Sequence, residues 1–113
     1  MLTFIASALG FLGVALGAFG AHGLSGRFTP ESRGWWETAV LYLLVHAVAV
    51  FASSLSGRTG LFSVGGWVMV FGALIFSGTL FAMALGAPRW FGAITPIGGL
   101  GLLAGWALFA VAA

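Results

Sequence analysis

A polar stripe runs along an otherwise apolar segment near the middle of the chain. At about 100° per residue in a helix, its members fall on one face. They are Thr38, Tyr42, His46 and Ser53, with two further hydroxyls, Ser77 and Thr79, in the next apolar segment. An ionisable residue inside a membrane is a functional candidate by default, and histidine changes its charge near neutral pH. His46 is therefore a candidate for gating or relaying protons.

A structural role competes with this chemistry at His46. A neutral imidazole that hydrogen-bonds a facing carbonyl, Ser77 or Thr79 would fix the register between two helices. Single polar residues commonly join helices in this way within membranes. We favour this interpretation of His46 over proton relay.

A second group of polar residues lies beside the first apolar segment. His22, Glu37 and Arg33 form a candidate interfacial site, and an enzyme that acts on lipids at the interface could use His22 and Glu37. We expect instead that Glu31 and Glu37 are ion-paired with Arg27 and Arg33, because these arginines are close to them in sequence. A nucleophile elbow, an HExxH motif and a phosphate loop are also absent. The sequence therefore favours a protein that is not an enzyme.

The sequence predicts neither a metal ion nor a cofactor. Cysteine is absent, and the two histidines, His22 and His46, belong to different segments and different depths. Metal ligands must converge within about 2 Å of the ion, and no carboxylate lies near His46 in sequence to complete such a site. Nucleic acid is also excluded as a partner, because four scattered arginines form no basic face.

The elements that must position these groups are membrane helices. Of 113 residues, 61% are hydrophobic and 5% are charged, whereas soluble domains carry about 25% charged residues. The apolar runs match the roughly 20 residues that an α-helix needs to cross a bilayer. We predict a single domain, an all-α bundle of four transmembrane helices at residues 2–21, 38–55, 61–85 and 96–113, with a polar interfacial segment at 22–37.

Local patterns at the boundaries refine this prediction. Thr29 and Thr95 each precede a proline, as an N-cap precedes the first helical residue, so the second helix could begin as an interfacial turn at Pro30. The tryptophans lie near predicted helix ends, where an aromatic belt would place them at headgroup level. They are Trp35, Trp36, Trp67, Trp90 and Trp106.

Two stripes of small residues predict close helix packing. The first helix carries Ala6, Gly10, Gly13, Gly17 and Gly20, and the fourth carries Gly98, Gly101 and Gly105. Such stripes let helix backbones approach closely in lipid. We favour packing within the monomer over contact with another copy or a partner subunit.

Four ordered motifs resemble the bacterial YgdD family of small inner-membrane proteins, a family of unknown function. They are Gly17-Ala-Phe-Gly-Ala-His-Gly-Leu24; Trp36-Glu-Thr-Ala followed by Tyr42 and His46-Ala47; Phe76-Ser-Gly-Thr-Leu-Phe81; and Thr95-Pro-Ile-Gly-Gly-Leu100 followed by Gly105-Trp106. The resemblance covers nearly the whole chain and implies four membrane helices in a bacterial inner membrane. It supplies no activity.

The resemblance also leaves the orientation in the membrane open. This chain has Phe81 where the family pattern has tyrosine, and it lacks a basic tail that would place the C-terminus in the cytoplasm. Counting arginines favours the opposite orientation, because Arg27, Arg33 and Arg89 lie on one side and Arg58 on the other.

Two classes of function follow from these residues. The first is a non-enzymatic accessory, structural or lipid- or small-ligand-binding module, whose partners are the bilayer and either further copies of itself or a larger membrane complex. The second is a small proton-linked transporter or ion channel that uses the polar stripe around His46.

Overall fold

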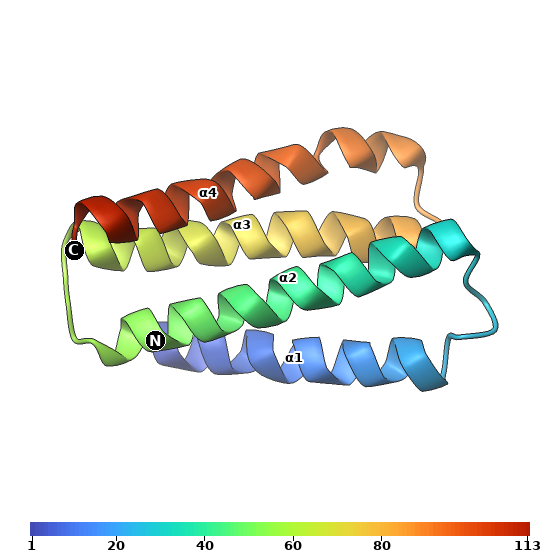
Figure 1. Cartoon of the computed structure of the whole chain (residues 1–113), viewed down its shortest axis with the longest axis horizontal. Helices are drawn as coiled ribbons and strands as arrows, with labels where there is room; N and C mark the ends of the chain where they lie inside the picture. Colours follow the sequence, from blue (N-terminus) through green and yellow to red (C-terminus); the bar gives the residue numbers. More distant parts are fainter.

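The computed structural model describes all residues, 1–113, and contains four long helices that run antiparallel in succession (Figure 1). They are α1 (Leu2–His22), α2 (Pro30–Leu55), α3 (Leu61–Ala84) and α4 (Thr95–Val111), and a short 3-10 helix, η1 (Arg89–Ala93), precedes α4. All four are long and apolar enough to cross a membrane. The predicted all-α, four-helix transmembrane fold is confirmed, and both termini lie at the same end of the molecule (Figure 1).

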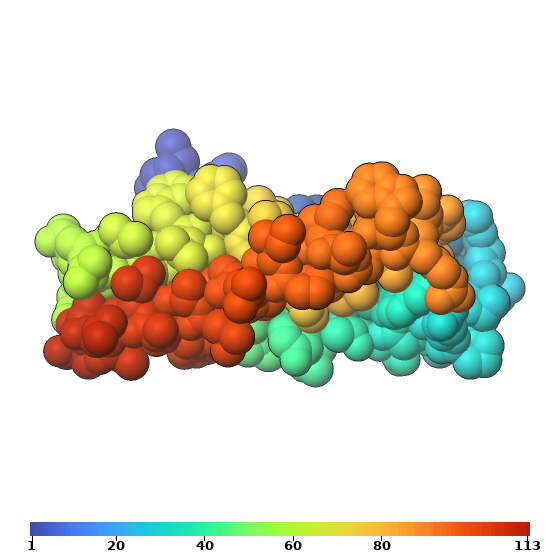
Figure 2. Space-filling view, turned by 90° about the horizontal axis from the view of Figure 1, so that it is seen from above, coloured from blue at the N-terminus to red at the C-terminus, as the bar shows by residue number.

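The helices pack in chain order as an open, flattened bundle. α1 packs against α2, α2 against α3 and α3 against α4. The molecule measures 45 × 27 × 18 Å, so its thickness is less than two helix diameters of about 10–12 Å. Seen from above, α4 covers the others, with α3 visible along one side and α2 along the other (Figure 2). The helices are therefore staggered in a shallow zigzag.

The second helix begins at Pro30, well before the predicted residue 38. A reciprocal cap at its start explains the difference: the Ser32 N–H donates to Oγ1 of Thr29 (3.1 Å), and the Thr29 N–H donates to Oγ of Ser32 (2.9 Å). Pro30 occupies the first turn, where its missing N–H has no helical partner to lose. Three of the four charged residues that suggested a connection, Glu31, Arg33 and Glu37, instead lie on the first two turns of α2, and Arg27 lies before it. The non-helical connection is limited to residues 23–29.

The predicted N-cap at Thr95 is wrong. Thr95 is the first residue of α4, and the preceding Ile94 has helical backbone angles and makes no side-chain cap. The hydroxyl of Thr95 lies 2.6 Å from that of Thr79 on α3 and 3.3 Å from the carbonyl oxygen of Phe91. Thr95 therefore joins η1, α3 and α4, because η1 has already turned the chain into helix before it.

The stripe of small residues on α1 faces α2. A Cβ added at Gly13 would lie 2.6 Å from Cδ2 of Leu44, and one at Gly17 would lie 3.2 Å from Cγ1 of Val40. Gly10 is looser, since its Cβ would stand 3.9 Å from Cβ of Ala47. Ala6 is buried in the main core cluster, which comprises Ala6, Leu9, Leu43, Ala47, Val50, Met69, Val70, Ala73 and Leu102.

The stripe on α4 crosses α3 at backbone distance. A Cβ at Gly72 of α3 would lie 2.7 Å from the Leu102 nitrogen, and one at Gly98 would overlap the Phe76 nitrogen. Gly101 faces Gly72, and a Cβ at Gly105 would lie 2.9 Å from Cβ of Met69. Glycines on both helices are thus required for this crossing.

Candidate functional site

His46 lies at the centre of the polar stripe and joins α2 to α4. Its side chain is buried, with 6% exposed. Nδ1 lies 2.7 Å from the Tyr42 carbonyl oxygen, and the Trp106 indole N–H donates to Nε2 over 3.1 Å. Because a carbonyl only accepts and an indole N–H only donates, these neighbours select the neutral ring with its proton on Nδ1.

The partners of His46 differ from the predicted ones. Ser77 and Thr79 do not contact the imidazole through hydrogen bonds; Ser77 donates to the Ala39 carbonyl (2.8 Å), and Thr79 meets Thr95. Trp106 takes their place, although its position near a helix end suggested an aromatic belt. The tryptophan lies half-exposed at the edge of the imidazole, with ring centroids 6.0 Å apart.

The remaining stripe residues serve mostly local contacts. Ser53 donates to the carbonyl of Val50 on its own helix (2.8 Å), and Thr38 is half-buried with no side-chain hydrogen bond within the protein. Tyr42 stacks beside His46 and against Phe76, with ring centroids 5.9 and 4.6 Å away. An apolar groove of about 600 Å³ lies along this face between α2 and α4. It is lined by Tyr42, His46, Phe76, Pro96, Gly99, Leu100, Leu102, Leu103 and Trp106.

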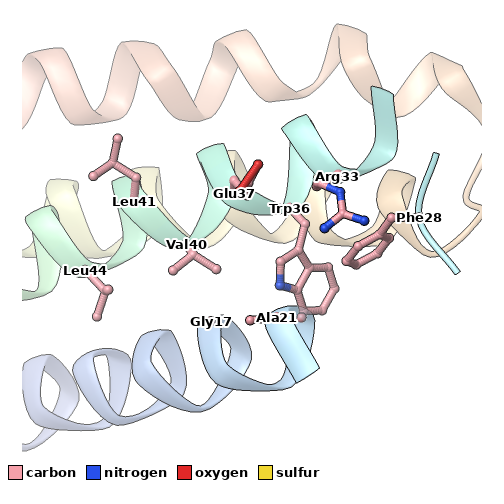
Figure 3. Close-up of a pocket in the computed structure, with 10 residues that line it drawn as sticks. Gly17, Ala21, Phe28, Arg33, Trp36, Glu37, Val40, Leu41 and Leu44 are labelled. Atoms are coloured by element: carbon pink, nitrogen blue, oxygen red, sulfur yellow. The ribbon is translucent and has the colours of Figure 1, made fainter. Parts of the chain in front are cut away.

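A second cavity, the interfacial pocket, lies between α1 and α2 at their loop-connected end (Figure 3). Its volume is about 420 Å³. The pocket is lined by Gly17, Gly20, Ala21, Phe28, Arg33, Trp36, Glu37, Val40, Leu41 and Leu44. Apolar side chains form the part that runs along α2 into the membrane, and the two charged side chains lie at the end near the connecting loop (Figure 3). The interfacial pocket is therefore amphipathic along its length.

Arg33 and Glu37 line this pocket together, whereas His22 does not. One guanidinium nitrogen of Arg33 donates to the Ser25 carbonyl oxygen over 3.0 Å. Glu37 is exposed and makes no hydrogen bond or ion pair within the protein. His22 ends α1 and is exposed. The three predicted interfacial residues are thus separated into a pair in the pocket and one outside it.

The predicted ion pairs of Glu31 and Glu37 with Arg27 and Arg33 are wrong. Glu31 pairs with Arg89 across the end of the bundle, and this is the only salt bridge in the structure. Both partners are more than half exposed, and exposed pairs contribute only about 0–1 kcal/mol. The extension of α2 to Pro30 places Glu31 beside the start of η1, which the charge spacing along the sequence did not reveal.

Trp36 forms the inner wall of the pocket and packs within the protein, a contact that the belt prediction did not include. It is buried, with 3% exposed, and its indole N–H donates to the Leu16 carbonyl on α1 over 2.9 Å. A Cβ at Gly20 would overlap the indole nitrogen. The small-residue stripe predicted that Gly20 faces another helix, but it did not identify Trp36 as the partner on α2.

Neither cavity gathers metal ligands. No three histidine, aspartate or glutamate side chains lie together in the structure, and His22 and His46 lie apart, one at the exposed end of α1 and the other within α2. The polar groups that converge are a guanidinium and a carboxylate at the pocket, and an imidazole bonded to an indole in the groove.

Comparison with known proteins places these features in a family. Residues 16–99 match the family model described as "Protein of unknown function (DUF423)". The UPF0382 inner membrane protein YgdD of Escherichia coli (strain K12) is 40% identical over 116 aligned positions, which cover 100% of this chain and 88% of that protein. The UPF0382 membrane protein YwdK of Bacillus subtilis (strain 168) is 40% identical over 107 positions, covering 90% and 86%. No solved structure matches the chain.

These matches confirm the resemblance drawn from the four motifs. The names of the relatives state a membrane location, which for the E. coli protein is the inner membrane. The four helices of this chain have the length and composition that such a location requires. The chain is a multi-pass protein of the bacterial inner (cell) membrane and belongs to the DUF423 (UPF0382) family of membrane proteins of unknown function.

Proposed function

We propose that the protein is a non-enzymatic membrane module that holds one lipid or small amphiphile in the interfacial pocket. The observation that carries the proposal is the pocket's polarity, charged at the end near the loop and apolar along α2. A molecule with a charged head and a hydrocarbon tail matches this order. A water-soluble substrate would make no apolar contacts with the wall formed by Val40, Leu41 and Leu44.

The size of the pocket is also suitable. Its volume of about 420 Å³ falls within the roughly 300–1,000 Å³ of small-molecule sites, which is enough for a headgroup and the first part of a chain. The rest of an acyl chain would lie along the exposed surface of Leu41 and Leu44 within the bilayer. The glycines of α1 create this space, because side chains at Gly17 and Gly20 would fill it.

A proton-linked transporter has less support from the geometry. Both ring nitrogens of His46 are engaged in the neutral state, and a second ring proton would point at the Trp106 N–H. Of the other polar groups of the stripe, Ser53 and Ser77 bond to backbone carbonyls and Thr79 meets Thr95, whereas the hydroxyls of Thr38 and Tyr42 have no partner within the protein. A relay would need a ring nitrogen of His46 that is free to exchange partners with such groups.

Native mass spectrometry of protein extracted gently from its own membrane tests the proposal. We expect a bound mass in the range of a lipid that survives mild activation. Ala21→Phe, at an exposed pocket residue, should reduce this adduct by filling the pocket. Ala15→Phe is the matched control, because Ala15 is also an exposed alanine of α1 but is separated from Ala21 by about 120° around the helix axis.

Two results would overturn this function. One is an adduct retained equally by wild type and Ala21→Phe. The other is wild-type protein that carries no amphiphile and co-migrates with a larger unrelated complex, which would favour an accessory subunit. Circular dichroism and thermal unfolding in detergent establish that both variants are folded.

A further inference from the structure

The interfacial pocket contains an acidic group that the protein itself leaves unpaired. Glu31, the other acid, is paired with Arg89, whereas Glu37 is exposed and makes no hydrogen bond or ion pair within the protein. Glu37 lies seven residues after Pro30, roughly 10 Å along α2, beside the apolar wall of the pocket. Where apolar side chains and lipid displace water from its surroundings, a carboxylate is stabilised by a cation that neutralises it. Arg33, the only cationic side chain that lines the pocket, makes no ion pair with Glu37.

The same pocket offers free donors for an anion. Arg33 uses one donor on the Ser25 carbonyl, and a guanidinium carries five N–H donors in all. The planar arrangement of the remaining donors suits two oxygens of a phosphate. Arg33 is one turn before Glu37 on α2, and Figure 3 shows their charged groups pointing in different directions at the polar end of the pocket.

The backbone positions of Arg33 and Glu37 are separated along the helix axis by a length that a small zwitterion can span. Residues four apart lie about 6 Å apart along a helix axis. Because Cα–Cβ bonds tilt towards the helix N-terminus, the Glu37 carboxylate leans towards the level of the headgroups. Trp36 and Phe28, with ring centroids 5.4 Å apart, add aromatic faces that attract cations.

We propose that the interfacial pocket selects a phospholipid whose headgroup carries a primary ammonium group, as phosphoethanolamine does. Its phosphate binds Arg33, its ammonium binds Glu37, and one acyl chain follows Val40, Leu41 and Leu44. This assignment rests on the proposed function. A choline headgroup has no N–H to donate to Glu37, and a glycerol headgroup supplies no positive charge.

A competition between lipids with identical acyl chains tests this selectivity. Delipidated protein is mixed with phosphatidylethanolamine, phosphatidylcholine and phosphatidylglycerol in equal amounts, and the retained lipid is measured by native mass spectrometry. A charge-assisted hydrogen bond is worth about 1.5–3 kcal/mol, so we expect at least a tenfold preference for phosphatidylethanolamine over each competitor.

Variants on α2 assign the preference to Glu37. Glu37→Gln should bind the ethanolamine and choline lipids equally while still retaining lipid. Glu31→Gln is the matched control, since it removes the same charge from the same helix outside the pocket, and it should keep the preference. Arg33→Gln should weaken retention of all three phospholipids, because each carries a phosphate.

The outcomes distinguish a failure of the headgroup assignment from a failure of the proposed lipid-binding function. Equal retention of the three lipids by wild type, or a preference that survives in Glu37→Gln, overturns the headgroup assignment and leaves lipid binding intact. No retained lipid in any mixture overturns both. The wild-type competition decides the inference even if a variant folds poorly.

Discussion

Trp106 on α4 donates its indole N–H to Nε2 of His46 on α2, over 3.1 Å. The two helices otherwise make few close approaches, because each packs mainly against α3. This bond therefore connects the second and fourth helices across the open side of the zigzag. It accounts for both residues without a catalytic role: the imidazole receives a donor for its free nitrogen, and the indole an acceptor within the membrane.

Removal of this bond should destabilise the protein in a way that a double-mutant cycle can isolate. His46→Leu and Trp106→Phe should each lower the free energy of unfolding. The double variant should lower it by less than the sum of the two single effects. Hydrogen bonds between membrane helices are worth about 0.6 kcal/mol on average, with a maximum of about 1.7. We expect a coupling energy in that range from equilibrium unfolding in mixed micelles.

Tyr42→Phe is the matched control for this cycle. It removes a hydroxyl that has no partner within the protein and keeps the ring that stacks between His46 and Phe76. Its unfolding free energy should match that of wild type. Additive effects of His46→Leu and Trp106→Phe would contradict a direct bond.

The sequence predicted the features that depend on neighbouring residues, and it missed those that depend on contacts between helices. Helix spans and the cap at Thr29 depend on neighbouring residues, so composition and local pattern were sufficient. The partner of His46 depends on how α2 and α4 approach across α3, which no local spacing encodes. The role of Trp36 was missed for the same reason, since it is fixed by Gly20 and Leu16 on α1. The charges indicated a polar interfacial segment at 22–37, and residues 30–37 of it form the first two turns of α2.

The crossing of α3 and α4 provides a second prediction. Gly72→Ala and Gly98→Ala each insert a methyl group against the backbone of the other helix, where no flexible side chain can move aside. We expect losses of about 1–3 kcal/mol in unfolding free energy, typical of overpacking. Gly78→Ala on α3 has open space around its Cβ and should be neutral or stabilising by up to about 1 kcal/mol through helix propensity. Similar effects at all three positions would argue against close backbone contact.

The contact between α1 and α2, where Gly13 faces Leu44, should also be destabilised by a larger side chain. Gly13→Leu would drive a side chain into Leu44 and separate the two helices, so folded yield and thermal stability in detergent should fall. Ala15→Leu makes a comparable enlargement at an exposed position of α1 and should leave both unchanged. Normal yield and melting temperature for Gly13→Leu would rule out a buried seam on this face.

The hydrogen bonds of His46 also predict the behaviour of the protein in transport assays. A relay requires a ring nitrogen that is free to accept a proton and then pass it on, but Nε2 is occupied by a donor and Nδ1 by an acceptor. Tyr42 is the only other titratable side chain lining the adjacent groove. Proteoliposomes under a pH gradient should therefore show no more proton flux than empty liposomes. The flux is measured with a pH-sensitive dye inside the vesicles, and an ionophore is the positive control. His46→Leu should behave identically. Flux in wild type that disappears in His46→Leu and persists in Tyr42→Phe would instead establish that the bond to Trp106 opens, and that the imidazole carries protons.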